Sequence, residues 1–116
     1  MPCRQTIRYW YSEEMRKPSL TDFPDEAAEI LIRQARSLMS GQRDRVANAA
    51  NLSALLFQEL EDVNWVGFYF LKGQELIVGP FQGKPACVSI PLGKGVCGTA
   101  AATREIQLVP DVQAFA

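Results

Sequence analysis

The 116-residue sequence contains no histidine. Histidine is the usual general base near neutral pH and the commonest metal ligand, so its absence excludes Cys–His nucleophile pairs and zinc sites built on histidine. Chemistry must therefore rest on thiols, carboxyl groups, hydroxyls or backbone amides. No metal or other cofactor is expected.

Long apolar runs and an excess of one charge are also missing. The apolar stretch from Val66 to Leu71 is far shorter than the roughly 20 residues that span a bilayer, and the first twenty residues lack the features of a secretory signal. Twelve basic and thirteen acidic residues give a formal charge of -1 without long blocks of one sign, unlike a nucleic-acid-binding surface. We expect a cytoplasmic protein that binds neither membranes nor nucleic acids.

What is present indicates one globular domain, since 47% of the residues are apolar and 22% are charged. Residues 1–20 show no clear period and are expected to form a flexible or weakly helical lead, which leaves residues 21–116 for the domain. The three cysteines are an odd number in a chain without an export signal. This count favours redox-active or unpaired thiols over a permanent disulfide framework.

Helical periodicity occurs twice in the first half of the domain. One helix is predicted to begin at Pro24 and to end at Gly41, and a second to follow Asp44 as its N-cap. The apolar faces of both helices are expected to pack against a sheet.

Strand patterns follow the helices. Residues 64–71 and 75–80 are rich in aromatic and β-branched types and flank a turn at residues 72–74, which predicts a hairpin. A third strand is predicted over residues 87–91, a short helix over 99–104 and a last strand over 106–109. Helices followed by hairpin-linked strands are typical of an α+β fold.

The first predicted strand places Trp65, Gly67 and Tyr69 on one face, because successive side chains alternate across a strand. Gly67 has no side chain, so a small ligand could lie there against two aromatic rings. Alternatively, Trp65 and Tyr69 only pack beneath the helices. The strand pattern alone favours the packing interpretation.

Cys97 follows Gly93 and Gly95 in a loop that opens a helix, where backbone N–H groups and the nearby Lys94 favour the thiolate. Cys87 could face Cys97 if the intervening loop folds back. Buried cysteines are nevertheless often inert small hydrophobes.

The six residues 93–98 also satisfy the G-x-G-x-x-G pattern of dinucleotide-binding folds. The short helix predicted after them argues against a Rossmann unit, because a parallel crossover needs a dozen or more residues.

Residues 64–112, which include the segments GKPACV and GKGVCGTA, closely resemble the signature region of the free methionine-(R)-sulfoxide reductases. A looser resemblance extends upstream to about Phe23. The resemblance implies a GAF-like α+β fold, with an antiparallel sheet flanked by helices. It also implies thiol-dependent reduction of free methionine-(R)-sulfoxide, with a disulfide recycled by thioredoxin.

Site residues are likewise implied by the resemblance. Cys87 and Cys97 match redox thiols of the family, and Trp65 and Tyr69 match aromatic positions of its substrate pocket. Family members continue past the segment matching residues 111–115 into a loop with a third cysteine, usually considered the attacking one, and then acidic residues. The chain is therefore expected to be a C-terminally truncated, partial GAF domain with doubtful activity.

Three further expectations concern the oligomeric state and the alternatives to an enzymatic function. An incomplete sheet exposes strand edges that can pair with another chain, so a homodimer is possible. A non-catalytic GAF module that binds a small molecule is the main rival function, although such a module has no need for two thiols in a glycine-rich, electropositive setting. A remnant without function is the third.

Overall fold

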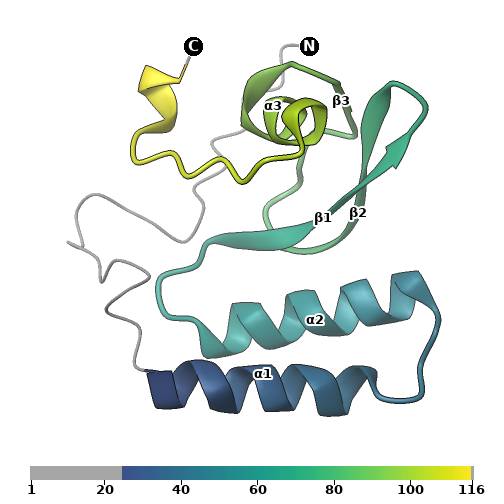
Figure 1. The fold of residues 1–116 in the computed structure, drawn as a ribbon, viewed down its shortest axis with the longest axis vertical. Helices are drawn as coiled ribbons and strands as arrows, with labels where there is room; N and C mark the ends of the chain where they lie inside the picture. Colours follow the sequence, from purple (N-terminus) through teal and green to yellow (C-terminus); the bar gives the residue numbers. More distant parts are fainter. Residues whose placement is uncertain (1–24, 116) are drawn as a thin grey trace.

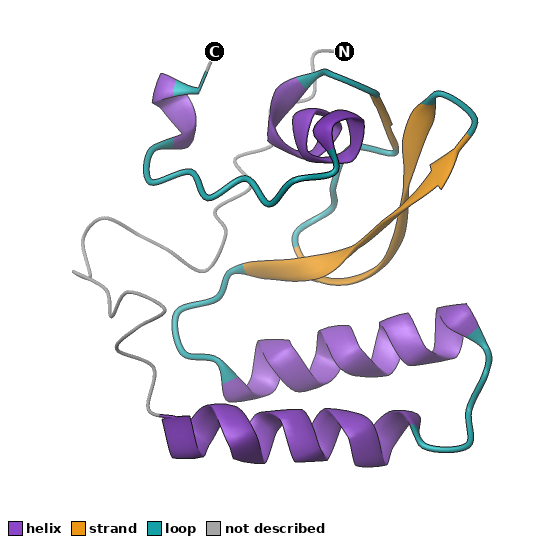
Figure 2. Cartoon of the chain, in the orientation of Figure 1, coloured by secondary structure: helices purple, strands orange, loops and turns teal. Residues whose placement is uncertain are grey.

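The computed structural model describes residues 25–115 and shows an α+β fold built around an antiparallel sheet (Figures 1 and 2). Three strands lie in the order β1-β2-β3. The lead predicted over residues 1–20 lies outside the described residues. The elements, in chain order, are α1 (Asp25–Met39), α2 (Arg45–Glu59), β1 (Trp65–Lys72), β2 (Glu75–Gly83), β3 (Ser89–Pro91), α3 (Gly95–Thr103) and the 3-10 helix η3 (Val112–Ala114).

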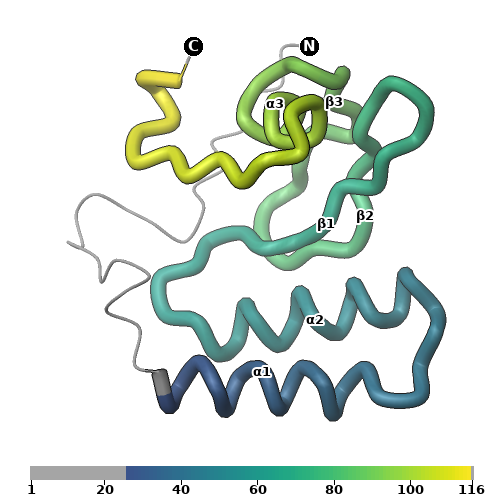
Figure 3. Tube along the Cα trace, viewed as in Figure 1, coloured from purple at the N-terminus to yellow at the C-terminus, as the bar shows by residue number. Residues whose placement is uncertain are grey.

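The two long helices form a helical hairpin below the sheet (Figure 3). Both were predicted, including the N-cap: the Asp44 carboxylate accepts a hydrogen bond of 2.8 Å from the backbone N–H of Ala47. Only α2 lies directly on the sheet, and α1 lies on the far side of α2 (Figure 1). The expectation that both helices contact the sheet therefore holds for α2 alone. None of the described helices is long and apolar enough to cross a membrane.

The hairpin of β1 and β2 contains a bulge. Trp65 pairs with Gly83 and Gly67 with Phe81, but the register then shifts, so that Tyr69 pairs with Val78. At the shift, Gly79 and Pro80 of β2 lie opposite the single residue Phe68 of β1. Proline has no N–H for the ladder and is tolerated at a bulge. As a result β2 continues past the predicted end at Pro80.

The two faces of β1 have different neighbours, as the alternation predicts. The Arg45 guanidinium of α2 lies 5.7 Å from the centre of the Phe70 ring, so Phe70 faces the helical layer. Ser53 of the same helix is fully buried and donates a hydrogen bond of 3.3 Å to the carbonyl oxygen of Pro80 in β2. Trp65 and Tyr69 consequently lie on the face turned away from α2.

The segment after β2 departs most from the predictions. β3 begins at Ser89 rather than Cys87, and α3 begins at Gly95, four residues earlier than predicted. Residues 106–109 form no strand: Ile106 and Leu108 are exposed and pair with no strand of the described sheet. The alternating apolar pattern at residues 106–109 does not by itself produce a strand, because a strand also needs the edge of another strand to pair with.

The Rossmann interpretation of residues 93–98 is wrong. The helix that follows has nine residues, and every strand pair in the described part of the chain is antiparallel. The glycines instead serve a tight connection between β3 and α3. A Cβ on Gly98 would lie 2.6 Å from the carbonyl oxygen of Pro91, so only glycine allows α3 to lie this close to β3.

Candidate functional site

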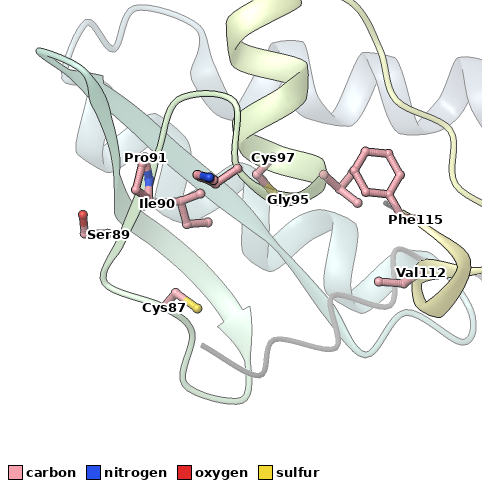
Figure 4. Close-up of a pocket in the computed structure, with 10 residues that line it drawn as sticks. Cys87, Ser89, Ile90, Pro91, Gly95, Cys97, Val112 and Phe115 are labelled. Carbon is pink, nitrogen blue, oxygen red and sulfur yellow. The ribbon is translucent and has the colours of Figure 1, made fainter. Parts of the chain in front are cut away.

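A pocket of about 310 Å³ lies between β3, the start of α3 and the C-terminal segment (Figure 4). Both cysteines that the sequence analysis selected line it. The other lining residues are Ser89, Ile90, Pro91, Lys94, Gly95, Val96, Val112 and Phe115. The fold therefore brings Cys87 and Cys97 to one cavity, as a thiol pair requires.

Cys97 is the third residue of α3 and a half-buried thiol. Lys94 is the N-cap of this helix, and its side chain makes no capping hydrogen bond. Gly95 has a φ of +65°, a backbone conformation that suits glycine and starts the helix. Cys97 thus lies in the first helical turn rather than in the loop before it. The backbone N–H groups of a first turn, together with Lys94, provide a positive environment.

Cys87 lies in the irregular segment of residues 84–88 between β2 and β3. Its side chain is half-buried, whereas the neighbouring Val88 is 68% exposed. Cys87 is disulfide-bonded in this structure, and Cys97 is not part of that bond. A Cys87–Cys97 disulfide is therefore a state that the structure does not contain.

Three aromatic rings form a row on the face of the hairpin that is turned away from α2. The Trp65 ring stacks on Phe81 with centroids 5.3 Å apart and on Tyr69 with centroids 6.1 Å apart. Sequence reasoning missed Phe81, because the predicted strand ended one residue before it. The register of the hairpin was the signal that could have identified it, since Phe81 lies opposite Gly67.

The space beside Gly67 is filled rather than open. A Cβ at this position would overlap the Cβ of Phe81 and lie 2.8 Å from its Cα. Gly67 therefore permits a close approach of β2 to β1. The expected gap for a ligand at Gly67 is wrong for this reason, although both flanking rings remain on one face.

The aromatic row and the thiol pocket meet at one hydrogen bond. The Tyr69 hydroxyl donates to the carbonyl oxygen of Cys87 over 2.9 Å. The alternative that Trp65 and Tyr69 pack beneath the two long helices is wrong, because both lie on the face turned away from α2. Trp65 and Tyr69 are not among the residues that line the pocket itself. The indole N–H of Trp65 is buried and has no hydrogen-bond partner among the described residues.

Within residues 25–115, no group of three or more Cys, Asp or Glu side chains is arranged to hold a metal ion. The described chemistry of the pocket thus consists of two cysteines, the Ser89 hydroxyl, the Lys94 ammonium and backbone amides.

Known proteins share this fold. The structure of a GAF sensor protein from Burkholderia vietnamiensis superposes with a TM-score of 0.76 at 62% identity, covering 78% of this chain and 58% of that one. The fRMsr of Staphylococcus aureus in complex with its substrate gives a TM-score of 0.71 at 54% identity, covering 72% and 55%. The free methionine-R-sulfoxide reductase of Escherichia coli is 52% identical over 85 residues, which is 73% of this chain and 52% of that protein.

These likenesses define the class of the protein: it has a GAF fold. No protein-family model matches the chain. At about half identity over most of its length, the chain belongs to the free methionine-R-sulfoxide reductase family. It spans little more than half the length of the curated relatives that it matches.

Proposed function

We propose that this chain carries redox thiols of an enzyme that reduces free methionine-(R)-sulfoxide to methionine. The observation that carries the proposal is the shared pocket of Cys87 and Cys97. Its volume of about 310 Å³ is at the small end of ligand sites, as suits a single amino acid. Relatives from Escherichia coli and Saccharomyces cerevisiae bear the name of this activity, and solved relatives hold their substrate.

The reaction requires two electrons from two thiols. A thiolate attacks the sulfoxide sulfur while an acid protonates the oxygen, and the products are methionine and a cysteine sulfenic acid. A second thiol condenses with the sulfenic acid to form a disulfide and water. An external dithiol then exchanges with the disulfide and restores both thiols.

Roles can be proposed for the residues of this chain. Cys87 and Cys97 supply the disulfide of the resolving step, with thioredoxin as the external dithiol. Trp65 and Tyr69 would bind the apolar part of the substrate from beside the pocket, whose lining does not include them. Tyr69 links this aromatic face to the pocket through its hydrogen bond to Cys87. A cytoplasmic location and a homodimer remain predictions.

The thiol chemistry is tested by mild oxidation of the reduced chain with diamide, followed by peptide mapping. We expect an intramolecular Cys87–Cys97 disulfide that thioredoxin reduces, lost in Cys97→Ser and retained in the matched control Cys3→Ser. An oxidised chain without this disulfide, or with one that thioredoxin leaves intact, would contradict the proposal.

The substrate is tested by offering the reduced chain the R and S epimers of free methionine sulfoxide. We expect thiol oxidation by the R epimer alone, and slow turnover because the chain covers about half of the Escherichia coli relative. The sensor alternative, suggested by the similar protein from Burkholderia vietnamiensis, predicts binding of a small molecule without thiol oxidation. Equal rates with both epimers would exclude the proposed selectivity.

A further inference from the structure

Cys87 lies in residues 84–88, which belong to no helix or strand. In this structure a disulfide holds its side chain, and hydrogen bonds hold the main chain of this segment. Two of these bonds reach consecutive carbonyl groups. The Tyr69 hydroxyl donates to the carbonyl of Cys87, and the Val78 N–H donates to the carbonyl of Val88, each over 2.9 Å. The two successive peptide units that follow Cys87 are thus each held by one hydrogen bond.

The two donors are themselves neighbours. Tyr69 and Val78 are cross-strand partners in the β1–β2 hairpin, at the first pair after the bulge. The Tyr69 ring is further held by stacking on Trp65. The hydroxyl is therefore presented from a rigid part of the sheet to an irregular segment.

The two side chains of this anchored segment have different surroundings. Cys87 is half-buried and lines the pocket, while Val88 is 68% exposed. A change in the backbone of Cys87 that turned its side chain out of the pocket would also move its carbonyl group. Such a change would break the hydrogen bond from Tyr69.

We infer that Tyr69 is a positioning residue for the Cys87 thiol and acts through its hydroxyl. This inference rests on the proposed redox role of the pocket and deepens it. It assigns to the hydroxyl of Tyr69 a role separate from contact between the ring and a substrate. Removal of the hydroxyl should release Cys87 locally, while the ring and the sheet remain in place.

Thiol alkylation tests the inference without any substrate. The fully reduced full chain and its Tyr69→Phe variant are treated with N-ethylmaleimide and digested with trypsin. Cleavage after Lys72, Lys94 and Arg104 places Cys87 and Cys97 in separate peptides, so each rate is measured in the same sample. We expect alkylation of Cys87 to accelerate about fivefold, as the loss of one neutral hydrogen bond implies. The rate at Cys97 should be unchanged and serves as the internal reference.

Ser53→Ala is the matched control, since it also removes one hydroxyl that donates to a backbone carbonyl, but this hydroxyl comes from α2 and reaches Pro80 of β2. It should leave the ratio of the two alkylation rates unchanged. If Tyr69→Phe lowers overall stability, the urea dependence of the Cys87 rate decides: local release gives a flat dependence and global unfolding a steep one. An unchanged Cys87 rate, or equal acceleration at both thiols, would overturn the inference. Neither result depends on whether the chain reduces methionine sulfoxide.

Discussion

Replacement of Gly67 by alanine should destabilise the sheet strongly. The new methyl group would overlap the Cβ of Phe81 and lie 2.8 Å from its Cα and 3.0 Å from the carbonyl oxygen of Pro80. These atoms belong to the backbone of β2 or are attached directly to it, so no side-chain rotation can relieve the overlap. The strands must separate at the point where the bulge already shifts their register.

The magnitude follows from two opposing terms. Overpacking of this kind costs about 3 kcal/mol, the upper part of the usual range. The smaller conformational entropy of alanine in the unfolded chain offsets about 0.5–1 kcal/mol. We therefore expect the free energy of unfolding to fall by about 2 kcal/mol. With a urea m-value of about 2 kcal/mol/M, the unfolding midpoint should fall by about 1 M.

Urea titrations followed by circular dichroism measure this shift. Gly79→Ala is the matched control, because it adds the same methyl group to the same sheet. Its Cβ would lie 3.0 Å from the edge of the Phe70 ring, which can move aside, and 3.1 Å from the carbonyl oxygen of Phe68, with no contact under 3.0 Å. The midpoint should therefore fall by less than half as much. A Gly67→Ala midpoint equal to that of the wild type would refute the close-approach argument.

Two further predictions concern the start of α2 and the sheet itself, and each has a matched control. Asp44→Ala removes the N-cap of α2 and should lower the free energy of unfolding by about 1 kcal/mol, measured by thermal or urea unfolding. Asp44→Asn keeps a capping side chain and should retain most of the stability. Equal losses in the two variants would contradict the capping role. Leu76→Ala should cost about 2–4 kcal/mol, because Leu76 is only 6% exposed. Leu71 is the cross-strand partner of Leu76 and is exposed, so Leu71→Ala should change the free energy of unfolding by less than about 0.5 kcal/mol. A larger loss would show that the exposed fraction does not predict the contribution of this side chain to stability.

Much of the local structure could be predicted from the sequence, because short-range physics determines it. The stop at Gly41, the cap at Asp44 and the turn around Gly73 each depend on backbone preferences of a few neighbouring residues, and the structure confirms them. The opposite faces of Phe70 and Tyr69 followed from strand alternation alone. The family resemblance carried the fold class, which the solved relatives confirm.

Only the tertiary structure decided how these elements meet. The bulge opposite Phe68 depends on where β2 can pair with β1, so the sequence did not reveal that Phe81 fills the space at Gly67. The absent strand at residues 106–109 has the same cause, since a strand exists only with a partner edge. The hydrogen bond from Tyr69 to Cys87 joins residues far apart in the chain, and no local pattern predicts such a contact. The residue types came from the sequence, and long-range packing decided which of them touch.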